Sequence, residues 1–167
     1  MSGTYASKTD VPVSRSRDEI ERTLQRFGAT AFAYMSNAEG QVAISFEIRQ
    51  LCVLMRMQLP RRDEFRLDSR GKVRSDSAIE RDWEQACRQR WRSLVNGIKA
   101  KLALIDDGIS SVEREFLGDV VPANGVTVGD RIIPQLPEIA RTGDLPELVP
   151  GATLPETKVI ELSERSG

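Results

Sequence analysis

The sequence predicts an α+β fold: a three-stranded antiparallel meander packed on one long helix, in the order α-β-β-β-α followed by short helices. Two periodicities support this prediction. Apolar residues recur at steps of three and four through residues 77–107, which is typical of a helix with one buried face. Apolar and polar residues alternate through residues 42–49 and 51–59, which is typical of strands with one buried face.

The long helix over residues 77–107 is the element that the others must cover. Ser77 and Glu80 have the spacing of a capping box, and Gly108 follows the last turn. Both tryptophans, Trp83 and Trp91, fall on its apolar stripe, so we expect them in the core. At 1.5 Å per residue the helix is roughly 45 Å long, so part of its apolar face could cover a second subunit.

The other elements follow from local signals. A first helix is expected over residues 17–27, with Ser16 as its cap, because Pro12 should prevent an earlier start. The first strand is expected over residues 30–36 and the first hairpin loop over residues 37–40. A last helix over residues 128–141 should be interrupted by Pro134 and Pro137. We expect flexible tails over residues 1–10 and 151–167, and a single domain over residues 11–150.

The residue types present argue against catalysis. The chain contains no histidine, and it has no CxxC, GxGxxG or Walker motif. We therefore expect neither an enzyme nor a cofactor or metal site. The two cysteines, Cys52 and Cys87, lie in apolar segments and are predicted to be buried and reduced. No apolar run is long enough to span a bilayer and the first residues do not have the order of a secretory signal, so we expect a cytoplasmic protein.

Charge is distributed unevenly along the chain. Residues 49–101 carry fourteen Lys or Arg against seven Asp or Glu, whereas residues 102–167 carry five against twelve. Nineteen of the twenty-four cations are arginines, whose planar guanidinium group suits phosphate. This segregation predicts a basic surface on the middle of the chain that binds a nucleic-acid backbone.

The predicted site combines the loop of residues 61–76 with one face of the long helix. The helix cations recur at steps of seven, four and seven, away from the apolar stripe. The alternative is a solvated helix face balanced by Glu80, Asp82 and Glu84. Phe32 and Tyr34 share one face of the first strand and could stack on bases, with core packing as their alternative. The predicted nucleic-acid-binding residues are Arg56, Arg61, Arg62, Arg66, Arg70, Lys72, Arg74, Arg81, Arg88, Arg92 and Lys99.

Four segments carry a resemblance to a family: DVPVSRSRDEIERTLQRFGATAF, RQRWRSLVNGIKAKL, EREFL and VGDRIIPQLPEI. Over about residues 10–150 the chain resembles a family of small, poorly characterised proteins encoded by bacteriophages and prophages. The genes of that family tend to lie near replication and recombination genes, so the resemblance implies a role in DNA metabolism. It brings no catalytic or binding residues, and the last seventeen residues are an addition to the family pattern.

Together these observations favour a non-enzymatic phage protein that binds single-stranded DNA, with duplex DNA as a second possibility. The alternative is a protein-interaction or adaptor module, or a self-assembling oligomer, that acts on a host or phage enzyme without nucleic acid. The predicted element order is also that of double-stranded RNA-binding domains. Acidic residues occupy the first turns of the long helix, however, and this argues against their mode of binding.

Overall fold

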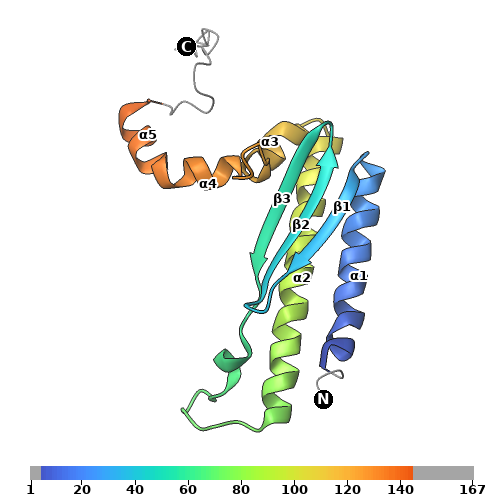
Figure 1. Ribbon diagram of the computed structural model, residues 1–167, viewed down its shortest axis with the longest axis vertical. Helices are drawn as coiled ribbons and strands as arrows, with labels where there is room; N and C mark the ends of the chain where they lie inside the picture. The colour runs from blue at the N-terminus through green and yellow to red at the C-terminus, as the bar shows by residue number, and fades with distance from the viewer. Residues whose placement is uncertain (1–4, 145–167) are drawn as a thin grey trace, which may run out of the picture. The chain divides into compact units, whose positions relative to one another are not determined.

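The computed structural model describes residues 5–144, with side chains over residues 14–144, and confirms the predicted α+β architecture (Figure 1). The chain divides into two compact units, residues 1–131 and 132–167. The main elements of the first unit are α1 (Tyr5–Arg26), β1 (Thr30–Ser36), β2 (Gln41–Ile48), β3 (Leu51–Gln58) and α2 (Asp76–Asp106).

The three strands form an antiparallel sheet in the order β1-β2-β3. Arg49 and Gln50 join β2 to β3 with φ angles of 48° and 66°, as a tight hairpin turn with two left-handed residues requires. The outer edge of β3 is covered near its start, where the Val121 N–H donates to the Cys52 carbonyl at 2.8 Å and Val120 forms a bridge with Val53. Within the described residues β1 pairs only with β2, and its register shifts at Ala31, where φ is 54°.

Helices α1 and α2 lie side by side against one face of the sheet and run in the same direction (Figure 1). Apolar residues of both helices face the alternating apolar residues of β2, so that one sheet face is buried and the other is left to solvent. The core consists mainly of Ile20, Leu24, Val42, Ile44, Phe46, Ile48, Val53, Trp91, Val95, Ile98, Leu102, Val112 and Phe116.

Aromatic side chains contribute to this core. The Arg17 guanidinium lies over the rings of Tyr34 and Trp91, at 5.6 and 5.2 Å from their centroids. The Tyr34 hydroxyl donates to the Arg17 carbonyl at 3.0 Å, and Phe32 stacks on Phe46 with 6.3 Å between ring centroids. The core interpretation of Phe32 and Tyr34 is thus confirmed, and neither ring is open for bases.

Two predicted helix starts are wrong. Helix α2 is capped by Ser75 rather than Ser77: Ser75 has an extended backbone and its hydroxyl accepts from the Ala78 N–H at 3.4 Å. Helix α1 begins at Tyr5, twelve residues before the expected start, and continues through Pro12. A proline removes one backbone hydrogen bond and can bend a helix, but the turns on either side can still form. Residues 5–10 of the expected tail are therefore helical.

The remaining elements are short. Residues 61–74 contain a 3₁₀ turn, η1 (Arg62–Phe65), and a bridge between Leu67 and Val73, so this loop has more structure than expected. The expected last helix is interrupted near its prolines, as predicted. The C-terminal tail over residues 151–167 lies outside the described residues. The short elements after α2 are α3 (Val112–Phe116), η2 (Leu117–Asp119), α4 (Val128–Ile132), η3 (Ile133–Gln135) and α5 (Leu136–Thr142).

Cys52 departs from its predicted burial. It is exposed because it alternates in phase with Arg56 and Gln58 on the uncovered face of the sheet. Cys87 is buried as predicted, and burial raises the pKa of its thiol to about 11.

Candidate nucleic-acid interface

The structure places most of the predicted site residues beside carboxylates. Eight of the eleven predicted cations form an ion pair with an Asp or Glu side chain within 4.0 Å. The charge of the predicted site is therefore partly neutralised within the protein itself. The pairs are Arg56–Asp130, Arg61–Asp63, Arg62–Glu80, Arg74–Asp82, Arg81–Asp82, Arg88–Glu84, Arg92–Glu19 and Lys99–Glu19.

The segment of residues 61–74 uses its charges to hold its own conformation. Its turn is fixed by Asp68, whose Oδ1 accepts from the N–H groups of Arg70 and Lys72 at 2.8 and 2.9 Å. Arg74 reaches α2, where its hydrogen bond is the main cause of the lowered pKa of Asp82. Among the described residues, the ion pairs within 4.0 Å do not include Arg66, Arg70 or Lys72.

The cations in the middle of α2 face α1. The Arg92 guanidinium donates to one carboxylate oxygen of Glu19 at 2.8 Å, and the Lys99 ammonium donates to the other. Hydrogen bonding to Lys99, and then the charge of Arg92, lowers the pKa of Glu19. One carboxylate therefore serves two cations, and a positive charge remains in excess.

Helix α1 adds a basic stripe that the sequence prediction missed. Arg15, Arg22 and Arg26 are exposed and recur at steps of seven and four, on the side of α1 opposite the buried Ile20 and Leu24. The signal was the same helical spacing that was recognised in the long helix. With Ser16 as the expected helix cap, Arg15 falls outside the predicted helix, and only Arg22 and Arg26 of the stripe remain on it.

These two stripes form one surface, which we call the helical basic face. It lies along α1 and α2, where Glu19 of α1 pairs with Arg92 and Lys99 of α2. Each stripe runs over twelve residues, and its first and last cations are about 16 Å apart along the helix axis. Its cations are Arg15, Arg22, Arg26, Arg88, Arg92 and Lys99, and its carboxylates are Glu19 and Glu84.

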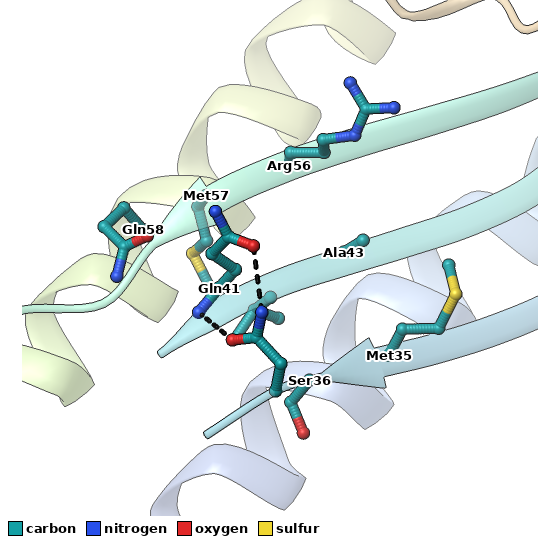
Figure 2. Close-up of a pocket in the computed structure, with 9 residues that line it drawn as sticks. Met35, Ser36, Gln41, Ala43, Arg56, Met57 and Gln58 are labelled. Atoms are coloured by element: carbon teal, nitrogen blue, oxygen red, sulfur yellow. Dashed lines mark hydrogen bonds between the residues drawn. The ribbon is translucent and has the colours of Figure 1, made fainter. Parts of the chain in front are cut away.

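A separate hollow of about 560 Å³ lies on the uncovered side of the sheet, near the β1–β2 loop (Figure 2). The amides of Asn37 and Gln41 are hydrogen-bonded to each other there at 2.9 Å, and Met35 lies across the hollow from Gln58. Arg56, its one charged lining residue, is paired with Asp130. The hollow can thus offer hydrogen bonds and thioether contacts, but no carboxylate for proton transfer.

Within residues 14–144, no three Asp, Glu, Cys or His side chains are grouped so that they could hold a metal ion. None of the helices in the described part of the chain is both long and apolar enough to cross a membrane.

Comparisons with known proteins complete the description of the site. No protein-family model, no curated protein and no solved structure matches this chain.

Proposed function

We propose that this chain is a non-enzymatic nucleic-acid-binding protein that contacts the phosphate backbone through the helical basic face. The observation that carries the proposal is the sharing of Glu19 between Arg92 and Lys99, beside the three exposed arginines of α1. Six cations against two carboxylates leave an excess of positive charge on two rigid elements. Phosphate contacts of this kind require no particular base sequence.

The ion pairs of this face are compatible with binding. The side chains of Arg92 and Lys99 are 58% and 45% exposed, and exposed ion pairs contribute only about 0–1 kcal/mol to stability. An arginine can therefore exchange a surface carboxylate for a phosphate, with which it forms two parallel charge-assisted hydrogen bonds. Arg66, Arg70 and Lys72 are secondary candidates on the loop.

The biological setting in the proposal is phage DNA metabolism, in replication or recombination within the host cytoplasm. It is supported by the family resemblance of residues 10–150 and by the charge of the helical basic face.

The direct test is fluorescence anisotropy with labelled oligonucleotides across a salt series. We expect a Kd below micromolar at 50 mM salt, with log K falling linearly as log salt concentration rises. The absence of binding to any oligonucleotide at 50 mM salt would disprove the proposal.

The second candidate function is an interaction module or self-assembling oligomer. The observation that favours it lies in the second unit, where Ile133 and Leu136 are 63% and 48% exposed. Light scattering after size exclusion separates a monomer from an oligomer. If the chain self-associates through these side chains, the double variant Ile133→Ser/Leu136→Ser should be monomeric, and an unchanged mass would reject their role.

A further inference from the structure

We infer that the polynucleotide bound by the helical basic face is a duplex, contacted through the phosphates of both its strands. This inference rests on the proposed function and names its substrate class. Three observations support it: the presence of cation stripes on two adjacent helices, the position of Glu19 between them, and the location of the aromatic rings.

The stripes on α1 and α2 form two parallel rows. Packed helices have axes about 8–10 Å apart, and the rows lie on helices that pack side by side. The minor groove of B-form DNA has an open width of about 6 Å, so we expect long Arg and Lys side chains on two adjacent helices to reach the phosphate rows on both of its sides. A single strand offers one row of phosphates and would leave one stripe unused.

Glu19 separates the two rows. It extends from α1 and accepts hydrogen bonds from Arg92 and Lys99 of α2, so its carboxylate lies between the stripes. A phosphate placed centrally between the helices would meet this negative charge. If the opening of a duplex groove lies over Glu19, the phosphates on its two sides meet the cations of α1 and of α2 instead.

The aromatic rings are not placed for base stacking, on which single-strand binding proteins usually depend. Among residues 14–144 every Phe, Tyr and Trp side chain is buried or half-buried, and none belongs to the helical basic face. The half-buried Trp83 has its indole N–H bonded to the Pro60 carbonyl at 2.8 Å. Contact through phosphates alone then favours the ligand with the higher charge density, which is the duplex.

The experiment compares three labelled ligands of one sequence without self-complementarity: a 20-base-pair DNA duplex, a 20-base-pair RNA duplex and the 20-nucleotide DNA strand. We expect at least one duplex to bind tenfold or more tightly than the single strand at about 100 mM salt. The slope of log K against log salt should be about −5 on DNA duplex, from six cations at about 0.9 each. The two duplex arms distinguish B-form from A-form geometry.

The outcomes separate this inference from the proposed function. A single strand that binds as tightly as both duplexes overturns the inference and leaves nucleic-acid binding intact. Failure of all three ligands to bind at 50 mM salt overturns the proposed function itself.

The two-row geometry has its own test in two neutralised variants. Arg15→Gln/Arg22→Gln/Arg26→Gln removes the α1 stripe, and Arg88→Gln/Arg92→Gln/Lys99→Gln removes the α2 stripe. Each should lower the duplex salt slope by about three, at roughly one per cation. If either variant keeps the full slope while its circular dichroism matches that of the parent, the two rows are not used together and the inference fails.

Discussion

The helical basic face and the segment of residues 61–74 contain the same number of cations, six each, and three cations of each form ion pairs, yet the two regions arrange their charge differently. In the segment, Arg61, Arg62 and Arg74 pair with carboxylates, and Asp68 fixes the turn from within. On the helical face, Arg88 pairs with Glu84, Arg92 and Lys99 share Glu19, and the three arginines of α1 lie exposed in one row. The two regions therefore differ in how their cations are aligned rather than in how many are paired.

The difference arises from backbone geometry. A helix aligns residues four and seven apart into a stripe whose members all point to the same side. A segment that turns back on itself can bring an arginine near an acidic neighbour, as Arg61 lies near Asp63 at 3.0 Å. The comparison predicts that the helices dominate binding.

The largest effect is expected from charge reversal. Arg15→Glu/Arg22→Glu/Arg26→Glu should weaken duplex binding at least 100-fold, because three attractive contacts become repulsive. The matched control Arg66→Glu/Arg70→Glu/Lys72→Glu makes the same change in charge on the loop and should cost less than tenfold. Anisotropy at a fixed salt concentration measures both. A larger loss in the loop variant would reverse the comparison.

Variants of Arg17 and Arg22 distinguish an arginine of α1 that stabilises the core from one that we expect to contact nucleic acid. Its guanidinium lies over Tyr34 and Trp91, so Arg17→Met should lower the free energy of unfolding by about 1–2 kcal/mol. Affinity for nucleic acid should change less than threefold. Arg22→Met should instead weaken nucleic-acid binding and leave the free energy of unfolding nearly unchanged. Anisotropy and urea unfolding measure the two quantities. Equal effects of the two variants on affinity would contradict the assignment of the stripe.

A variant of Glu19 tests whether its pairing with Arg92 and Lys99 limits the positive charge that can contact nucleic acid. Glu19→Gln should strengthen binding about three- to tenfold by releasing Arg92 and Lys99, whereas Glu21→Gln, which forms none of these pairs, should have a smaller effect. Weaker binding by Glu19→Gln would show that the carboxylate positions the cations instead.

The difference in stability between the parent protein and Glu19→Gln should depend on pH. Hydrogen bonding to Lys99 and the charge of Arg92 lower the pKa of Glu19 in the folded protein. The ionised Glu19 therefore contributes to the stability of the fold at pH values above 4.5, the ordinary pKa of a glutamate. That contribution is lost as the pH falls through the folded pKa. The difference in stability between parent and Glu19→Gln should therefore shrink below about pH 4.5, as urea unfolding can measure.

The smallest effect is expected from the turn between β2 and β3, and the variant would provide a more stable protein in which to repeat the binding measurements. Arg49 and Gln50 adopt positive φ angles that Asn and Gly adopt more easily, so Arg49→Asn/Gln50→Gly should raise the free energy of unfolding by about 1 kcal/mol. The Arg49–Glu113 pair that it removes is long, at 4.0 Å, and exposed. Arg49→Lys keeps the backbone strain and is the control; a less stable double variant would contradict the argument.

The sequence was sufficient to predict elements with a clear period. The alternation of Val42, Ile44, Phe46 and Ile48 predicted β2 and its buried face, and the spacing of apolar residues predicted α2. Helix starts were less predictable, because several serines near each start could act as caps and only the backbone geometry selects Ser75. Pro12 predicted a later start of α1, but the helix accommodates it in its second turn.

The candidate site was less predictable than the fold for a physical reason. An ion pair such as Arg92–Glu19 joins residues 73 positions apart, and no local pattern reveals it. The unexpected exposure of Cys52 has a different cause, since alternation along β3 did indicate its face but its apolar neighbours suggested burial.

The bulge at Ala31 has a consequence for solubility. Within the part of the chain that the structure describes, β1 is an edge strand, and an edge strand exposes backbone groups that can recruit the same strand of another molecule. The left-handed residue and the broken register interrupt that ladder near its start, so an incoming strand could not follow β1 along its whole length. We therefore expect the conformation of Ala31 to disfavour edge-to-edge pairing of this sheet with a second copy.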